Sequence, residues 1–157
     1  MRLLLVHHGD ALPSEIDPQR PLSSVGRAAV DLLAARVAAR GVKPTAIWHS
    51  GKLRARQTAE AFWRACNPLA ELKAVRGLQP DDRPRTMIQA LSDVRGDLLI
   101  VGHMPNLPRL LGALTTGDLD AAPPFPLHGI VALERVEDGR WEERWREEGG
   151  WEIGSRK

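Results

Sequence analysis

Short apolar runs alternate with longer segments of helical periodicity along most of this chain. The runs predict strands, because apolar residues without polar alternation are typical of strands covered on both faces of a parallel sheet. We expect strands at about residues 2–7, 44–49, 71–75 and 97–102, and helices near residues 24–40, 52–66, 84–94 and 106–115. The alternation predicts an α/β fold, a three-layer α/β/α sandwich with a mostly parallel central sheet.

The C-terminal part of the sequence departs from this alternation. Residues 129–136 and 140–145 flank the turn Glu137-Asp138-Gly139, a pattern typical of an antiparallel hairpin. We expect the hairpin to close one edge of the sheet, with Trp141 and Trp145 packed on the same face because of their even spacing. The 157 residues contain no repeat or linker, so we expect a single domain over residues 1–157.

Composition narrows the class of protein. The single cysteine, Cys66, excludes an internal disulfide and a cysteine-rich metal site, and it fits a reducing compartment and a packing role. No apolar run approaches the roughly 20 residues of a membrane span, and no leader pattern precedes the first strand. The formal charge of +2 comes without a basic tract interleaved with aromatic residues. We therefore expect a cytoplasmic protein without a nucleic-acid or membrane partner.

Polar residues gather where the predicted strands end and where helices begin. In parallel sheets ligands bind at the carboxyl ends of the strands, and helix N-termini carry unpaired N–H groups that attract anions. Histidine and arginine side chains there would suit a transferring phosphoryl group with its three equatorial oxygens. The segments are His7-His8-Gly9-Asp10, Arg20-Pro21-Leu22, Ser50-Gly51-Lys52-Leu53-Arg54-Ala55-Arg56-Gln57-Thr58 and Val101-Gly102-His103-Met104-Pro105-Asn106.

Each of these segments has an ordinary structural explanation when it is taken alone. A histidine beside a strand is commonly packed and hydrogen-bonded, and an arginine early in a helix, such as Arg54 or Arg56, is commonly solvated. Their coincidence at strand ends favours a functional site. We expect packing roles for His49 and His128, which match no motif, and we expect His49 to be the nearer of the two to the pocket.

The order and spacing of the motifs resemble the histidine phosphatase superfamily, in particular its small SixA-type phosphohistidine phosphatase branch with a phosphoglycerate mutase-like fold. The resemblance runs from residue 3 to about residue 134. It is carried by Val6-His7-His8-Gly9-Asp10-Ala11, Arg20-Pro21-Leu22-Ser23 with Gly26, Ser50 with Leu53-Arg54-Ala55 and Gln57-Thr58-Ala59, and Gly102-His103.

The resemblance implies a phosphatase in which His8 is the nucleophile. Neutral His8, with one ring nitrogen held as N–H by a backbone carbonyl, would attack phosphorus and form a phosphohistidine, and water would then release inorganic phosphate. Arg54 and a cationic His103 would bind the equatorial oxygens, with Arg20 and Ser50 as further phosphate-binding residues. We expect neither a cofactor nor a metal.

Position 7 departs from the family pattern, because this chain has His7 where the family has arginine. Arginine is always charged and binds two oxygens at once, whereas imidazole is charged only below a pKa near 6.5. A phosphate dianion beside His7 would raise that pKa and favour the imidazolium. We expect a weakened or pH-dependent pocket, in which His7→Arg gains activity at pH 8.

The proton donor for the leaving group is the least defined part of the predicted site. Larger superfamily members use a carboxylic acid between the third strand and the next helix, where this chain offers Asp81 and Asp82; Asp10 lies nearer the nucleophile. Because imidazole leaves more easily than an alkoxide, the lack of a clear acid favours a phosphorylated protein carrying phosphohistidine. A small phosphorylated molecule is the alternative substrate.

Two further functions fit parts of the sequence. A metallohydrolase would use His7, His8, Asp10, His49 and His103 as ligands, although neighbouring strand residues point to opposite faces and so do not chelate together easily. A non-catalytic phosphate-binding or phosphopeptide-binding protein would explain the missing arginine.

Overall fold

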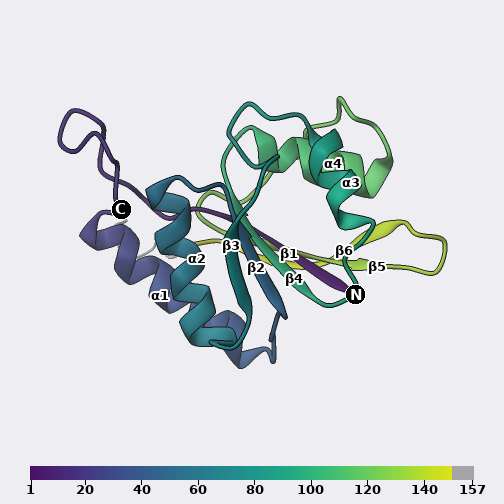
Figure 1. The fold of residues 1–157 in the computed structure, drawn as a ribbon, viewed down its shortest axis with the longest axis horizontal. Helices are drawn as coiled ribbons and strands as arrows, with labels where there is room; N and C mark the ends of the chain where they lie inside the picture. The colour runs from purple at the N-terminus through teal and green to yellow at the C-terminus, as the bar shows by residue number, and fades with distance from the viewer. Residues whose placement is uncertain (150–157) are drawn as a thin grey trace.

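A six-stranded mixed sheet forms the centre of the protein, described here from a computed structural model for residues 1–149 (Figure 1). The strands lie in the order β3-β2-β4-β1-β5-β6. The elements are β1 (Arg2–His7), α1 (Ser24–Ala39), β2 (Ala46–His49), α2 (Leu53–Cys66), β3 (Glu71–Ala74), α3 (Pro84–Leu91), β4 (Leu98–Gly102), α4 (Asn106–Thr116), β5 (Ile130–Arg135) and β6 (Trp141–Glu147).

Helices cover the sheet from both sides, with α1 and α2 on one face and α3 and α4 on the other (Figure 1). Strands β3, β2, β4 and β1 are parallel, and the hairpin β5-β6 adds two antiparallel strands beside β1. The predicted three-layer sandwich with a mostly parallel sheet and a C-terminal hairpin at its edge is confirmed. No helix among residues 1–149 is long and apolar enough to cross a membrane.

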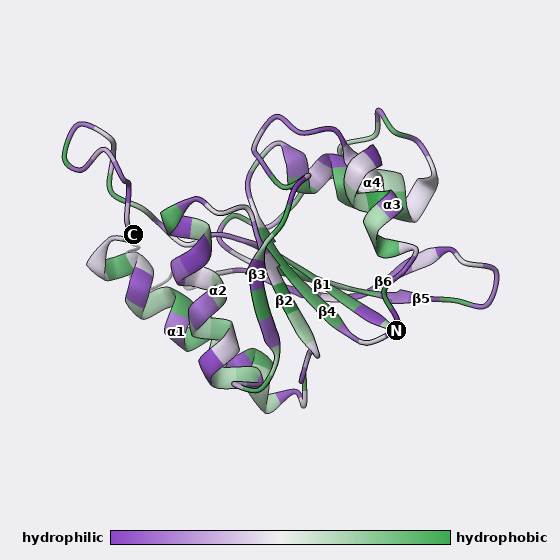
Figure 2. Cartoon of the chain, in the orientation of Figure 1, coloured by the Kyte–Doolittle hydropathy of each residue, from purple (hydrophilic) through white to green (hydrophobic). Residues whose placement is uncertain are grey.

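The absence of alternation in β1 follows from its burial on both faces. Leu4 and Val6 pack into the cluster beneath α1 and α2, whereas Leu3 and Leu5 pack into the cluster beneath α3 and α4. All four side chains are at most 1% exposed. The hydrophobic colouring of Figure 2 accordingly concentrates in the central strands and the inner helix faces.

Local signals set the helix ends. Ser23 caps α1 through a hydrogen bond from the Gly26 N–H to its hydroxyl, and Gly41, with φ +85°, follows the helix C-terminus. Helix α3 is shorter than expected because the residues after Leu91 form tight turns: the Val94 N–H donates to the carbonyl three residues earlier. Burial raises the pKa of the Cys66 thiol to about 11, which supports its packing role.

The expectation that Trp141 and Trp145 share a face is wrong. Strand β6 contains a bulge: Ala132 pairs with Trp145, whereas the next residue of β5 pairs with Glu143, which leaves Arg144 as the extra residue. Trp141 therefore packs on the α3/α4 side and Trp145 on the α1/α2 side.

Candidate active site

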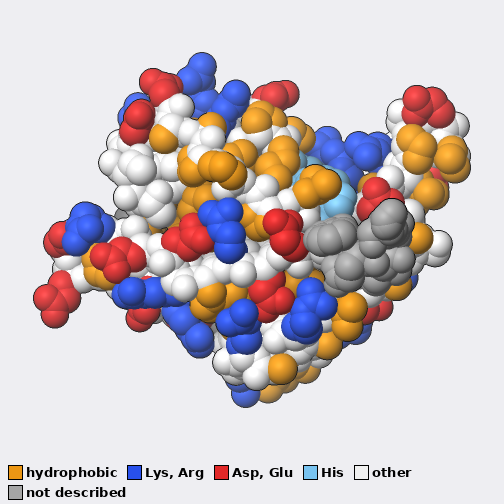
Figure 3. All heavy atoms as spheres, turned by 180° about the vertical axis from the view of Figure 1, so that it is seen from behind, with side chains coloured by type: hydrophobic (Ala, Val, Ile, Leu, Met, Phe, Trp, Pro, Cys, Tyr) orange, Lys and Arg blue, Asp and Glu red, His pale blue; other side chains and the backbone are white. Residues whose placement is uncertain are grey.

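All five histidines of the chain lie along one edge of the sheet. His7 ends β1 and His8 follows it, His49 ends β2, and His103 follows β4. His128 precedes β5, whose start lies at this edge because β5 is antiparallel to β1. Ring centroids are 5.0 Å apart between His103 and His8, 4.4 Å between His8 and His7, and 4.9 Å between His7 and His128. In Figure 3, histidine side chains are visible between apolar side chains and a group of Lys and Arg side chains.

His8 is held with one ring nitrogen fixed by the backbone. Its Nδ1 lies 2.7 Å from the Gly9 carbonyl oxygen, which can only accept, so Nδ1 carries the proton and Nε2 carries the free lone pair. Burial lowers the pKa of His8 to about 4, although the bond to Gly9 opposes this shift. A neutral imidazole with Nε2 as its nucleophilic atom is therefore the form present near neutral pH.

The backbone beyond His8 is fixed by contacts from α1 and α2. The Gly9 N–H donates to Thr58 Oγ1 at 3.0 Å. A Cβ on Gly26 would lie 2.1 Å from the Asp10 carbonyl oxygen, so only glycine allows α1 to approach this closely. Asp10 is exposed, and its carboxylate accepts a 2.7 Å hydrogen bond from the Ser23 hydroxyl at the start of α1. Thr58 and Gly26, which the sequence analysis named only as parts of motifs, therefore position the backbone that follows His8.

Two arginines approach the histidines from different elements. Arg20 sits in a left-handed conformation with φ +49°, and its Nε donates to the Leu12 carbonyl at 2.9 Å. Arg54 lies in the first turn of α2, whose N-terminus has no side-chain cap. Burial lowers the pKa of the Arg54 guanidinium, and the positive charge of Arg20 lowers it further. Two guanidinium groups this close favour an anion between them.

Ser50 and His103 form a buried polar pair. Ser50 Oγ and His103 Nε2 are 2.6 Å apart, and the Lys52 N–H donates to the same hydroxyl at 3.3 Å. Burial, followed by the charges of His8 and Arg54, lowers the pKa of His103 to about 3. His103 is therefore neutral in the anion-free site, and its cationic form with a bound phosphoryl group stays a prediction. His103 Nδ1 and Arg54 Nε are buried without a hydrogen-bond partner among residues 1–149.

His7 is buried, and a backbone hydrogen bond fixes its tautomer. It is 5% exposed, and its Nδ1 accepts the backbone N–H of His128 at 2.8 Å, so the ring proton is on Nε2. Burial, with smaller contributions from the neighbouring histidines, lowers the pKa of His7 to about 2. Without a bound anion His7 is therefore neutral near pH 7. The imidazolium expected beside a phosphate dianion stays a prediction.

His128 belongs to the histidine cluster, contrary to our expectation of a separate packing role. Its ring stacks on His7 with an interplanar angle of 5°, and its Nδ1 donates to the His8 carbonyl oxygen at 2.7 Å. The backbone at His128 adopts φ +53°, which turns the chain into β5. His49 instead accepts the Gly51 N–H on its Nδ1. No motif marks His128, because only the antiparallel pairing of β5 with β1 brings it to this edge.

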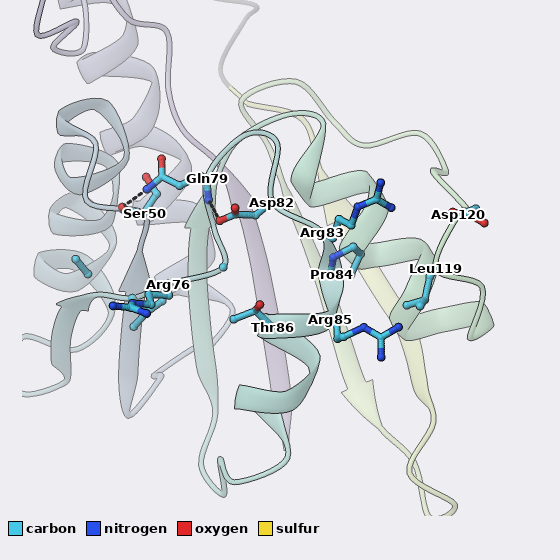
Figure 4. A pocket seen from close by; sticks show the side chains of 13 residues that line it. Ser50, Arg76, Gln79, Asp82, Arg83, Pro84, Arg85, Thr86, Leu119 and Asp120 are labelled. Atoms are coloured by element: carbon cyan, nitrogen blue, oxygen red, sulfur yellow. Dashed lines mark hydrogen bonds between the residues drawn. The ribbon is translucent and has the colours of Figure 1, made fainter.

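A cleft of about 990 Å³ opens beside Ser50, between the end of β3 and the start of α3 (Figure 4). Gln79 joins the cleft wall to the histidine site, because its Nε2 donates to the Ser50 carbonyl at 2.8 Å and its backbone N–H donates to Asp82 Oδ2 at 2.9 Å. Asp81 is exposed and lines a neighbouring smaller cavity. Asn106, fully buried in α4, donates to the Asp82 carbonyl and holds this loop, a role that the sequence did not indicate.

Comparison with known proteins identifies the family. Residues 3–80 match the histidine phosphatase superfamily (branch 1). The chain belongs to the histidine phosphatase superfamily. Members of this superfamily are phosphatases. No curated protein is significantly similar to the chain in sequence.

Solved structures of the same superfamily fold match the chain over nearly its whole length. A structure of the protein histidine phosphatase SixA complexed with tungstate is 25% identical, with a TM-score of 0.81 over 98% of this chain and 100% of that one. A candidate phosphohistidine phosphatase SixA from Agrobacterium tumefaciens is 27% identical, with a TM-score of 0.75 over 92% and 96%. A candidate alpha-ribazole-5'-P phosphatase from Escherichia coli, 17% identical with a TM-score of 0.73 over 92% and 94%, shares the fold.

This member of the histidine phosphatase superfamily also carries a group of three potential metal ligands. One ring nitrogen each of His7, His8 and His128 lies within 4.8 Å of the others; within residues 1–149, Asp10, His49 and His103 do not join such a group. Metal-bound histidines usually donate their second N–H to an acceptor, as His8 and His128 do. His7 instead accepts through Nδ1, so its coordination through Nε2 would require loss of the bond from His128.

Proposed function

We propose that this superfamily member is a metal-independent phosphatase that works through a phosphohistidine on His8. The observation that carries the proposal is the 2.7 Å bond from His8 Nδ1 to the Gly9 carbonyl, which leaves Nε2 of a neutral imidazole with its lone pair free. Nε2 attacks phosphorus in line with the leaving group, and the P–N bond forms as the bond to the leaving group breaks. Water then attacks the phosphohistidine, releases inorganic phosphate and restores neutral His8.

The positive charge that stabilises the phosphoryl group comes from two arginines rather than from residue 7. Arg54 and Arg20 are permanent cations beside the histidines, and they bind the equatorial oxygens of the phosphoryl group. Ser50 and His103, whose ring centroid lies 5.0 Å from that of His8, supply further polar contacts. A bound phosphate dianion favours protonation of the neighbouring imidazoles, because an opposite charge stabilises the cationic form. His7 contributes its Nε2–H in place of the guanidinium of the family pattern.

A phosphohistidine-bearing protein is the substrate that the site suits best. Asp10 is engaged by Ser23, and Asp81 lines a different cavity from the cleft beside Ser50, so neither carboxylate is committed to protonating an alkoxide. An imidazole leaving group needs a proton donor less than an alkoxide does, because imidazole leaves more easily. The similarity to the two SixA structures supports the same substrate class. We propose a single domain over residues 1–157 that carries this reaction without a cofactor.

Two other functions are compatible with parts of the site. A small-molecule phosphomonoesterase would use the same nucleophile on an alkyl or sugar phosphate. A non-catalytic phosphate-binding protein is favoured by one observation, the neutral and buried His7 where the family has arginine.

Trapping the phosphoenzyme tests the proposal. Wild type, His8→Asn and the matched control His49→Asn are mixed with a phosphorylated histidine peptide or p-nitrophenyl phosphate in excess EDTA, and then quenched in base. We expect an acid-labile phosphoprotein and phosphate release for wild type and the His49 variant, and neither for His8→Asn.

Other results would overturn the proposal in distinct ways. Phosphate binding without any phosphoenzyme would identify a binding protein. Activity abolished by EDTA and restored by zinc or manganese would identify a metallohydrolase. Turnover of the chromogenic ester with no turnover of the phosphohistidine peptide would favour a small-molecule substrate.

A further inference from the structure

The cleft beside Ser50 is much larger than a phosphoryl group requires. Its volume of about 990 Å³ lies at the upper end of the range for small-molecule sites. It begins at Ser50, whose hydroxyl bonds His103, and extends between the end of β3 and the start of α3 (Figure 4). If His8 takes the phosphoryl group as proposed, the part of the substrate that carries this group extends into the cleft.

Unpaired positive charge lines this cleft. Arg76 comes from the β3 side, and Arg83 and Arg85 come from the α3 side (Figure 4). Within residues 1–149, none of the three makes an ion pair or a side-chain hydrogen bond, whereas arginines of the β5-β6 hairpin such as Arg144 are paired with glutamates. Asp82 and Asp120 also line the cleft, and one oxygen of the Asp82 carboxylate accepts the Gln79 N–H. The three arginines exceed these two carboxylates in charge. The arginines therefore favour a ligand that carries carboxylates.

A free edge of the sheet leads into the same cleft. Strand β3 is the edge strand. On the side toward β2, the N–H groups of Glu71 and of Val75, the residue after β3, donate to the carbonyls of Thr45 and His49. Because bonding alternates along a strand, the N–H and C=O groups of Leu72 and Ala74 face away from β2, and no strand among residues 1–149 pairs with that side. An extended peptide can pair with such an edge through its own backbone.

We propose that the β3 edge and the arginine-lined cleft together bind an acidic, extended segment of the phosphorylated protein substrate. The segment pairs with Leu72 and Ala74, its carboxylates contact Arg76, Arg83 and Arg85, and its phosphorylated side chain reaches His8. This inference rests on the proposed function and specifies its substrate. A small phosphate ester with a second anionic group would use the arginines but not the strand edge.

The sheet geometry sets the spacing within that segment. Strand β3 is parallel to β1, so its carboxyl end lies at the same edge of the sheet as His8. A strand added outside β3 lies four strand spacings from β1, about 19 Å, which about six extended residues span. We therefore place the phosphorylated residue about six positions from the part of the segment that pairs with β3.

The test compares three substrates: an acidic peptide of about 12 residues carrying phosphohistidine, the same peptide with Gln in place of Glu, and p-nitrophenyl phosphate. The cleft variant is Arg76→Gln/Arg83→Gln/Arg85→Gln, and the charge-matched control is Arg64→Gln/Arg95→Gln/Arg144→Gln, away from the cleft. We expect the cleft variant to lose about 10-fold in kcat/KM for the acidic peptide, from three partly exposed charge contacts. The other two substrates change less than about 2-fold, as do all three in the control variant.

The variant Ala74→Pro tests the strand edge separately. Proline removes the outward N–H of Ala74 and leaves the bonds to β2 intact, which edge strands tolerate. We expect about a 5-fold loss in kcat/KM for the acidic peptide, as for one lost hydrogen bond. Unchanged turnover of p-nitrophenyl phosphate shows that this variant is folded.

Two results would overturn the inference. One is equal kcat/KM for the acidic peptide and its Gln counterpart; the other is dependence on the arginines with no effect of Ala74→Pro, which would identify a small anionic substrate. Fluorescence anisotropy with the unphosphorylated acidic peptide separates this inference from the proposed function. Arginine-dependent binding without turnover of any substrate refutes the phosphatase and supports the docking site.

Discussion

Acid should destabilise this protein through its buried histidines, and His7 allows that effect to be isolated. Its folded pKa of about 2 lies far below the ordinary value of 6.5 that applies to the unfolded chain. As the pH falls below 6.5, the unfolded chain binds a proton that the folded protein does not, so stability is lost. Above 6.5 both states are neutral at this position, and the full stability is present.

The magnitude follows from the unfolded pKa alone as long as the folded pKa stays well below the test pH. The slope approaches about 1.4 kcal/mol per pH unit once the pH is well below 6.5, and the loss for His7 between pH 7.5 and pH 5.0 is about 2 kcal/mol. This is a large share of a typical folding free energy of about 5–15 kcal/mol. His8 and His103, with pKa values of about 4 and 3, add losses in the same window.

Urea unfolding followed by circular dichroism at pH 7.5 and pH 5.0 measures the effect. We expect His7→Asn to be less stable than wild type at pH 7.5, yet to lose about 2 kcal/mol less than wild type between the two pH values. The control Val6→Ala, which removes buried volume from the neighbouring position of β1, should keep the wild-type pH dependence. An unchanged pH dependence in His7→Asn would refute a neutral, buried His7.

Two further substitutions test the contacts around the nucleophile. Thr58→Val leaves the buried Gly9 N–H without an acceptor, so we expect it to lower the unfolding free energy by about 1–3 kcal/mol and to reduce phosphatase activity. Thr58→Ser keeps the hydroxyl and should retain both stability and activity. Equal stability of the two variants in thermal melts would contradict this role. His7→Arg should raise phosphatase activity at pH 8, because it adds a permanent positive charge. It should also lower the unfolding free energy by about 1–3 kcal/mol, because arginine cannot accept the His128 N–H. Activity and stability are both measured at pH 8, and a loss of activity in a folded variant would show that position 7 does not require a guanidinium.

The sequence predicts the sheet well because strand burial leaves a direct pattern. The run from Leu3 to Val6 is apolar throughout, since each face of β1 meets a helical layer. Residues that follow strand ends could also be located, because parallel strands deliver their carboxyl ends to one edge. This reasoning places His8, Ser50 and His103 in one region, where the structure brings them together.

The parts that escaped prediction depend on pairing between distant segments. His128 joins the cluster only through the antiparallel register of β5 on β1, which no local pattern reveals. Trp145 changes faces because a bulge adds one residue to β6. The tautomer of His7 is fixed by a backbone N–H from 121 positions away, and its low pKa is caused mainly by burial, so neither could be read from the residue type alone.

The placement of all five histidines at one edge of the sheet has a consequence for how the molecule responds to its surroundings. Histidine is the side chain whose ordinary pKa falls between pH 5 and pH 8, and in this chain every copy stands in or beside the proposed catalytic site. The remaining surface of the domain carries Lys, Arg, Asp and Glu, whose ordinary charges are constant over that range. Because burial lowers the pKa values of His7, His8 and His103 to about 2, 4 and 3, a change of pH between 5 and 8 leaves these three side chains neutral in the anion-free site. The arrival of an anion, rather than a change in acidity, is what favours their charged forms.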